Sequence, residues 1–360
     1  MISTLKQTIS QLLFLSVFLL ILGSCNKKQK KAAGLLPSAK GDKGEIILVM
    51  DTARWNGPLG DELRKIFLSR VPGLPQPEPM FTVRAIDPFK FSSFLTQHKN
   101  LLFVTSLEDN TPGNRKMIKK FSPEALERIK IDTSLYMQTS TDEYAKGQFV
   151  VNLFGIDDAT LLQKLKNNAE KIRETFNKVE RERLISDIRK TKMNNKLMEI
   201  VKTKHNFSMR IPQGYKLAKD TTNFIWLRFT EYEFDKNILI SYKPYRSTEE
   251  FQHENIVQLR NDIMQKQTQD PDNAAYFVVT EELIPPVFKE TSINGNYAIE
   301  ARGLWKLKHR FMGGPFLSYT FVDKAGERLF YIEGFVSAPG TTKREHIREL
   351  EVLLRTFQTF

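Results

Sequence analysis

The sequence has one cysteine, Cys25, among its 360 residues. A single thiol has no partner within the chain, so the body of the protein is built without disulfides. Hydrophobic residues make up 41% of the chain, which is ordinary for a globular protein and sufficient for sizeable cores. Beyond residue 22 no apolar run approaches the roughly 20 residues that cross a bilayer. The chain is therefore neither a disulfide-stapled scaffold nor a multispanning membrane protein.

The common catalytic signatures are missing as well. We find no Walker glycine-lysine loop, no Gly-x-Ser-x-Gly elbow, no His-Glu-x-x-His zinc motif and no dinucleotide-binding glycine fingerprint. The histidines are scattered without ligand-like spacing, at His98, His205, His253, His309 and His346. We therefore expect no cofactor and no metal, and the sequence favours a non-catalytic protein over an enzyme.

The one notable apolar run lies near the start of the chain, at residues 12–22, after a single charge at Lys6. Its length suits the core of a signal peptide and is too short to span a membrane. Leu22-Gly23-Ser24-Cys25 follows and resembles a bacterial lipobox, in which the cysteine is acylated and becomes the first residue of the mature chain. We expect residues 1–24 to be the signal peptide and Cys25 the lipidation site. The alternative is a short N-terminal anchor with a chance cysteine.

Residues 25–44 are expected to form a flexible tether, rich in lysine, glycine and serine. Four lysines directly after Cys25 would meet anionic headgroups and make a two-signal anchor to the lipid bilayer. A solvated linker is the alternative. No acidic residue follows the cysteine, and this favours a periplasm-facing orientation in the bacterial cell envelope.

Acidic residues are fewer than basic ones, and the net charge is +12. Such a surface attracts lipid headgroups, acidic glycans or nucleic acid, although a merely soluble lysine-rich surface is the more common explanation. An envelope location makes nucleic acid a poor match. The partners we expect are the bilayer and an envelope protein or anionic envelope ligand.

Strand-like and helix-like segments alternate over residues 45–156. Residues 45–51, 81–87, 101–107 and 148–155 have strand patterns, and Pro58 and Ser122-Pro123 begin helices between them. The alternation predicts an α/β domain. Residues 157–203 then predict a long basic helix as connector, with apolar positions Leu161, Leu165, Ala169, Ile172, Phe176 and Val179; after Val179 this pattern loses its register.

Residues 204–360 contain mostly strand signals. Two sequences typical of capping boxes, Ser247–Glu250 and Thr342–Glu345, are expected to open helices, the second closing the chain with an apolar face. We therefore predict an α+β domain, an antiparallel sheet with covering helices, joined to the first domain by the long helix.

Two clusters contain residue types suited to binding. The first follows the first strand and includes the proline-rich loop: Asp51, Arg54, Trp55, Asp61 and Glu78. Open α/β sheets bind ligands at the carboxyl ends of their strands. Asp51, Asp61 and Glu78 could act as acid and base in an envelope glycan or peptide hydrolase. The simpler interpretation is that the acids complement a helix dipole and Trp55 anchors a turn.

The second cluster combines Arg302 and Trp305 with a Gly-Gly-Pro turn. A turn of this kind, flanked by apolar side chains, could form an adaptable lip for a ligand or partner. The alternative is a hairpin with its aromatic residues in the core. The residues concerned are Arg302, Trp305, Met312, Gly313, Gly314 and Phe316.

Several motifs together resemble one family. They are the lipobox, WNGPLGDELR, PGLPQPEP, AKGQFVV, ERERL, GLWKLKHRFMGGPF and GFVSAPGTTKREHIRELE. In order and spacing they are similar to the envelope lipoproteins known as domain of unknown function 4837, typical of the Bacteroidetes, over nearly the whole mature chain. The resemblance implies no activity, cofactor or catalytic residue. Residues 205–360 also resemble, in layout, the PsbP/Mog1/LpqN-like domains, which are mostly accessory or binding modules.

Three functions follow as expectations. The leading one is a membrane-anchored accessory module that binds an envelope protein or ligand through its two domains. The second is the carboxylate hydrolase. The third, capture of a solute between the domains, requires a sizeable cleft near Trp55 or Trp305.

Overall fold

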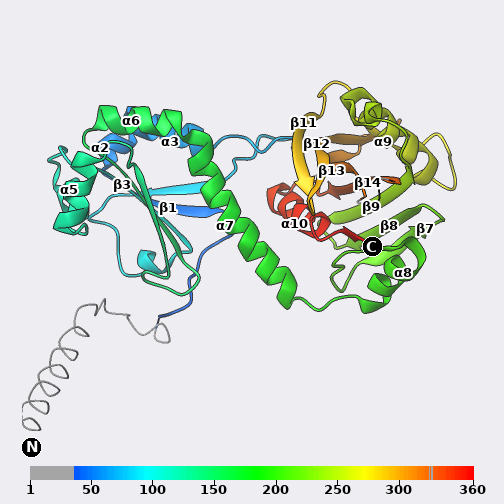
Figure 1. Cartoon of the computed structure of the whole chain (residues 1–360), viewed down its shortest axis with the longest axis horizontal. Coiled ribbons are helices and arrows are strands. Elements are labelled where there is room, and N and C mark those ends of the chain that lie inside the picture. Colours follow the sequence, from blue (N-terminus) through cyan, green and yellow to red (C-terminus); the bar gives the residue numbers. More distant parts are fainter. Residues whose placement is uncertain (1–35, 324, 326) are drawn as a thin grey trace, which may run out of the picture.

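The computed structural model describes residues 36–323, 325 and 327–360, and these form two lobes side by side (Figure 1). Cys25 and the expected signal peptide lie outside the described residues. The α/β domain and the antiparallel-sheet domain predicted from the sequence are both confirmed, and a helix over 169–190 links them.

A five-stranded sheet forms the N-terminal domain, in the order β2-β1-β3-β5-β4. Strands β2, β1, β3 and β5 are parallel, and the edge strand β4 pairs antiparallel to β5. The bounds are β1 Glu45–Val49, β2 Thr82–Ile86, β3 Asn100–Ser106, β4 Met137–Thr141 and β5 Phe149–Gly155.

Both faces of this sheet are covered, which explains why its central strands are mostly apolar. On one face Ile46, Leu48 and Leu102 pack against three helices, and on the other Ile47 and Phe103 pack beneath shorter helices. The helices of the domain are α2 Thr52–Trp55, α3 Pro58–Phe67, α4 Pro112–Ile118, α5 Pro123–Ile131, α6 Asp158–Asn167 and the 3-10 turn η1 Leu95–Gln97.

The connector is helical but is not one continuous helix. It is divided into α6, α7 Ala169–Lys190 and α8 Asn195–His205. The first break is at Asn168, whose side chain donates to the carbonyl of Lys164 and whose ψ of 17° leaves the helical range. The second follows Thr191, where the chain turns to place Asn194 as the N-cap of α8. A single helix over 157–203 was therefore wrong.

Helix α7 packs into both domains, and this explains why its apolar pattern changes register. Ile172 and Phe176 belong to the core of the N-terminal domain, whereas Leu184 and Ile188 belong to the core of the C-terminal domain. Between these pairs, the buried Glu180 accepts hydrogen bonds from the Gly44 amide and from Asn100 Nδ2. The 22 residues of α7 make a rod of about 33 Å that is fixed at both ends.

The main sheet of the C-terminal domain is eight-stranded, in the order β10-β12-β13-β14-β9-β8-β7 with β11 paired to β12, and all its pairings are antiparallel. Its strands are β7 Lys216–Asp220, β8 Phe224–Thr230, β9 Asp235–Pro244, β10 Val278–Thr280, β11 Val287–Ile293, β12 Asn296–Leu307, β13 Gly313–Val322 and β14 Arg328–Ser337. A small separate pair joins β6 Phe207–Ser208 to β15 Gln358–Thr359.

Helices cover both faces of this sheet too. Helix α8 and α10 Arg344–Leu354 pack on one face, and α9 His253–Gln267 packs on the other. The capping box at Ser247 opens only the 3-10 turn η2 Thr248–Phe251, and the Ser247 side chain makes no cap bond. The capping box at Thr342 does not form either. Glu78 of the N-terminal domain caps α10 in its place.

Candidate functional site

Arg54 lies at the carboxyl ends of the parallel strands, as the first cluster predicted, but it is buried in a network of polar side chains. Its Nη2 atom lies 2.7 Å from both Asp158 Oδ1 and Ser106 Oγ, and its Nη1 donates to Asn114 Oδ1 at 3.3 Å. Asp109 makes a second ion pair at 3.4 Å. Since the donors of Arg54 are shared among partners of its own domain, this cluster stabilises the junction of β3, α4 and α6.

The neighbouring members of the first cluster also have structural partners. Asp51 accepts from the amide of Ala53 and caps α2. Trp55 is half-buried, with the Arg64 guanidinium 4.6 Å from its ring centroid. Asp61 is exposed and pairs with Arg64 one turn further along α3 at 2.7 Å. These contacts match the simpler interpretation of helix capping and a turn anchor.

Glu78 lies at the amino ends of the parallel strands, opposite to Arg54 and Asp51. It is buried and accepts from the amides of Lys343 at 2.8 Å and Arg344 at 2.9 Å, which caps α10 from across the domain boundary. Glu78 precedes β2, whereas Asp51 follows the parallel neighbouring strand β1, so the two residues lie at opposite ends of these strands. The five residues of β1 separate the two ends by about 17 Å. Asp51 and Glu78 are therefore too far apart to act as an acid–base pair, and Asp61 pairs with Arg64, so this arrangement does not favour the hydrolase.

The second cluster does not form an apolar lip. Trp305 and Phe316 are 4% and 2% exposed and belong to the core beneath α9; Trp305 Nε1 donates to the carbonyl of Val336. Gly313 and Gly314 begin β13, and a Cβ on Gly314 would lie 2.1 Å from the carbonyl oxygen of Val336. Met312 is exposed at the hairpin. The glycines serve close strand packing, so the hairpin alternative is the correct one.

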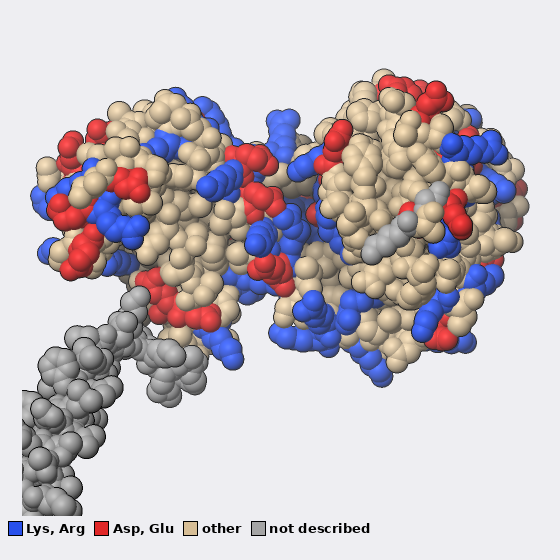
Figure 2. Space-filling view, viewed as in Figure 1, with Lys and Arg blue, Asp and Glu red and all other residues tan. Residues whose placement is uncertain are grey.

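Arg302 is the member of the second cluster that faces a cavity. A cleft of about 970 Å³ lies between α7 on one side and β11, β12 and α10 on the other. Neither Trp55 nor Trp305 lines it, so the cleft expected for solute capture is present at a different place. Figure 2 shows Lys and Arg gathered along the waist between the two lobes, with acidic side chains among them.

The lining of the cleft is strongly charged. Nine of its residues are basic and six are acidic: Arg173, Lys178, Arg181, Arg189, Arg210, Lys289, Arg302, Arg348 and Arg355, with Glu170, Glu174, Glu180, Glu182, Glu300 and Glu351. Ten further residues of the lining are apolar: Val71, Pro72, Met80, Leu184, Ile185, Met198, Met209, Val287, Ile347 and Val352. The other five are uncharged and polar: Asn177, Ser208, Thr291, Thr356 and Gln358. The volume and the mixed lining suit a small-molecule site.

Two arginines and two glutamates of the lining form a closed network. Arg302 lies 2.6 Å from Glu300 and 2.8 Å from Glu351, and Arg355 lies 3.6 Å from each glutamate. Burial opposes ionisation of Glu351, but the adjacent Arg302 guanidinium lowers the pKa of Glu351 below its ordinary value. Burial and the two glutamates raise the pKa of Tyr319 well above its ordinary value. The Glu351 carboxylate is therefore charged and the Tyr319 hydroxyl is protonated near neutral pH.

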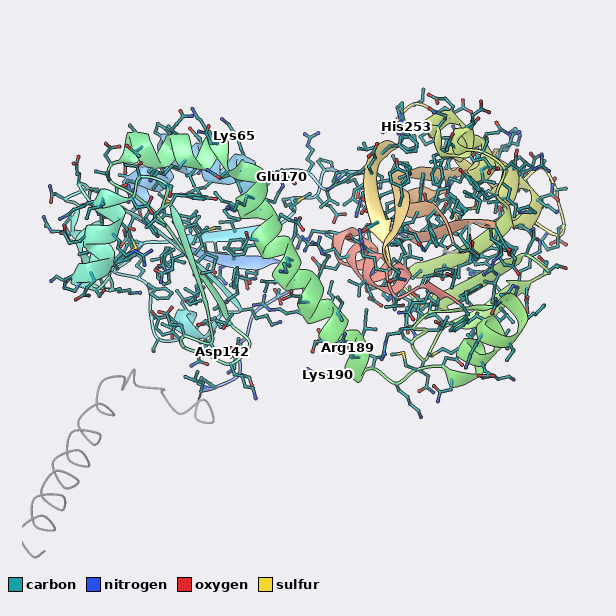
Figure 3. All side chains as sticks on the ribbon, viewed as in Figure 1. Lys65, Asp142, Glu170, Arg189, Lys190 and His253 are labelled. Carbon is teal, nitrogen blue, oxygen red and sulfur yellow. The ribbon has the colours of Figure 1, made fainter. Side chains whose placement is uncertain are left out.

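Four cations of the lining have no such partner. Within residues 36–323, 325 and 327–360, no carboxylate lies within ion-pair distance of Lys178, Arg189, Arg210 or Lys289. Figure 3 shows the extent of the α7 wall, from Glu170 at its upper end to Arg189 at its lower end. Unmatched positive charge beside an apolar wall favours an anionic ligand.

Sequence reasoning found Arg302 and missed the rest of this site. Glu351 and Arg355 lie on the closing helix and in the turn after it, and Arg210 lies in the segment that follows β6. One signal was present: Arg181, Ile185 and Arg189 recur at four-residue spacing on α7, along the face that lines the cleft. No local pattern indicated which domain this face would meet.

Neither a metal-binding cluster nor a membrane-spanning helix occurs in the part of the chain that the structure describes. Among the described residues, no group of three or more His, Cys, Asp or Glu side chains could hold a metal ion. None of the helices over 36–360 is long and apolar enough to cross a bilayer.

Two family models match the chain, one for each domain. Residues 194–356 match the domain of unknown function DUF4837, and residues 39–189 match a second domain of unknown function, DUF8532. The resemblance to the first family is therefore confirmed for the C-terminal part. The N-terminal domain matches its own model, so the two models together cover residues 39–189 and 194–356.

Among solved structures, similar proteins include one from Bacteroides thetaiotaomicron, with 12% identity and a TM-score of 0.24 over 43% of this chain and 45% of that chain. The match thus spans less than half of the Bacteroides protein. The Ran-binding protein Mog1p of Saccharomyces cerevisiae gives 8% identity and a TM-score of 0.30 over 43% and 90%. LpqN, involved in cell envelope biogenesis of Mycobacterium tuberculosis, gives 7% and 0.27 over 42% and 82%.

Mog1 and LpqN are the proteins whose layout the C-terminal sequence resembles, and both are among the matches. Scores this low carry no conclusion about function. A search of the curated proteins found no match.

Proposed function

We propose that this chain is a non-catalytic accessory module of the bacterial cell envelope, anchored by an acylated Cys25, and that it binds an envelope ligand in the cleft between its domains. The single observation that carries the binding role is that cleft of about 970 Å³, with its excess of arginine and lysine. The anchor rests on the Leu-Gly-Ser-Cys sequence and the lysines that follow it.

Two features support a binding role. Helix α7 is part of both cores, and Glu78 of one domain caps α10 of the other, so the two walls of the cleft are held in a defined relation. A site that is formed before its ligand arrives loses less free energy to ordering on binding.

The anchor is tested by intact mass and fractionation of the full chain from its own membrane. We expect the mature protein to begin at Cys25 and to have a mass increment for acyl chains. We also expect the Cys25→Ser variant to lose both the acyl increment and membrane association. An unmodified Cys25 on a membrane-bound chain would contradict the proposed anchor.

The binding role is tested by native mass spectrometry of the same preparation in mild detergent. We expect a small molecule retained at one copy per chain. A stoichiometric second polypeptide would show that the module binds a protein and would contradict the small-ligand site. A bare chain that retains nothing would contradict both.

A further inference from the structure

The cleft differs along its length, and its lower end has the features of an anion site. This lower end is formed by the last turns of α7, the segment after β6 and the end of α10. Arg189, Arg210 and Arg355 line it, together with Leu184, Ile185 and Met198. The three arginines thus come from three separate segments and line the same cleft only in the folded chain.

Two of these arginines have buried donors without an acceptor. The Nε atoms of Arg210 and Arg355 are buried and make no hydrogen bond within the described residues. Arg355 Nε lies 3.6 Å from Glu351 Oε1, which is beyond hydrogen-bond distance. The segments are neighbours, because the Arg210 amide donates to Thr356 Oγ1 at 2.9 Å. An unpaired buried donor is costly, but an Nε atom this deeply buried is closed to a ligand as well as to water. A ligand in the cleft would meet the outer guanidinium nitrogens. Those of Arg210 make no hydrogen bond or ion pair within the described residues, whereas Arg355 Nη1 donates to the carbonyl of Ser292 at 3.3 Å.

The apolar side of the lower end is equally well defined. Leu184 is buried in the core of the C-terminal domain, and Ile185 and Met198 are half-buried against that core while they face the cleft. Leu, Ile and Met side chains do not bind an anion. They provide a surface on which a hydrocarbon segment loses contact with water.

We propose that the lower end of the cleft binds an anionic amphiphile. Arg189 and Arg210 hold its phosphate or carboxylate group, and its hydrocarbon part lies on Leu184, Ile185 and Met198. Arg355 adds positive charge beside them but is already paired with Glu300 and Glu351. This assignment rests on the proposed function and names the ligand class for the same cleft. Guanidinium groups suit phosphate and carboxylate because their donors form a planar fork that matches these oxygens.

The test is calorimetric titration of the full chain held in phosphatidylcholine nanodiscs, with empty nanodiscs as the blank. The probes are dihexanoyl phosphatidylglycerol, dihexanoyl phosphatidylcholine and inorganic phosphate. We expect the anionic lipid to bind at one site, and both the zwitterionic lipid and free phosphate to bind at least tenfold more weakly. Equal binding of inorganic phosphate would overturn the role of the hydrocarbon surface, and no binding of the anionic lipid would overturn the proposal.

Two variants locate the site. Arg210→Gln is expected to weaken the anionic lipid by about tenfold or more, because a hydrogen bond to a charged group is lost. Arg128→Gln changes charge equally on the exposed face of α5 and is expected to leave affinity unchanged. Equal affinity of both variants with the unchanged chain would overturn the site.

The outcome is separable from that of the proposed function. A neutral molecule retained by the membrane-extracted chain, together with no binding of the anionic lipid, would contradict only the ligand class. A chain that retains nothing from its membrane and binds none of the three probes would contradict the ligand-binding role itself.

Discussion

Arginines in two regions of this molecule differ in how their charge is met. Arg54 in the N-terminal domain and Arg260 in the C-terminal domain are buried and matched by acidic partners within one domain. Arg189 and Arg210 line the cleft between the domains and have no acidic partner among the described residues. The first kind stabilises a fold, and the second kind leaves charge available for a ligand. The two kinds also differ in burial, because Arg189 is exposed and Arg210 is only half-buried.

The largest effect is expected at the ion pair of the C-terminal core. Arg260 and Glu333 are 1% and 0% exposed and form two hydrogen bonds, of 2.9 and 2.8 Å. Glu333→Ala leaves the guanidinium buried without a counter-charge, and we expect it to lower the free energy of unfolding by about 3 to 5 kcal/mol. Urea unfolding followed by tryptophan fluorescence measures this change. Glu282→Ala, on an exposed loop, is the control; similar values for both would contradict the matched role.

A smaller loss is expected at Arg54. Arg54→Ala removes the ion pairs to Asp109 and Asp158 and leaves the buried Asn114 and Ser106 without a partner for one bond each. Because Asp158 remains about half exposed, the expected cost is about 2 to 3 kcal/mol, measured by the same unfolding experiment. If Arg54→Ala abolished ligand retention with unchanged stability, Arg54 would belong to a binding site after all.

A still smaller loss of stability is expected when the hydrogen bonds that join Glu78 to the other domain are removed. Glu78→Ala removes the cap of α10, which is expected to cost about 1 to 2 kcal/mol. The local readout is faster hydrogen exchange at the amides of Lys343 and Arg344, which donate to Glu78. Asp61→Ala, which removes one exposed ion pair, should leave both measurements unchanged. Unaltered exchange at the two amides in Glu78→Ala would contradict the cap.

The smallest change in stability is expected at the cleft. Arg210→Gln removes no ion pair, so the free energy of unfolding of the ligand-free chain should stay within about 0.5 kcal/mol. Thermal and urea unfolding of delipidated protein measure it. A loss of stability as large as that of Arg54→Ala would show that Arg210 stabilises the fold, as Arg54 and Arg260 do. The distinction between structural and ligand-binding arginines would then fail.

Sequence reasoning succeeded where the pattern is local. The apolar strands of the N-terminal domain and the apolar positions from Leu161 to Phe176 were predicted correctly. Each element buries side chains at a regular spacing, and this spacing is visible within a short window of sequence. The register change after Val179 was visible but not explained, because its cause is a second core contributed by residues far along the chain.

The failures have one physical cause in common. Ser247 and Thr342 have capping-box spacing, yet the cap of α10 comes from Glu78, a residue distant in sequence. Asp51 and Glu78 were grouped from the sequence, yet they lie at opposite ends of the parallel strands. Arg210 and Arg355 are far in sequence, yet their segments are hydrogen-bonded to each other. The spacing of charged residues in the sequence does not show which residues they will face in the fold. The cleft could therefore be identified only from the structure.

The most direct test is a crystal structure of the full chain purified from its own membrane. We predict electron density in the lower end of the cleft for a molecule with a phosphate or carboxylate group. Its oxygens should lie within hydrogen-bond distance of the outer guanidinium nitrogens of Arg189 and Arg210, and its hydrocarbon part should lie on Leu184 and Met198. A cleft that is empty, or one filled by a polypeptide, would contradict the binding of an anionic amphiphile.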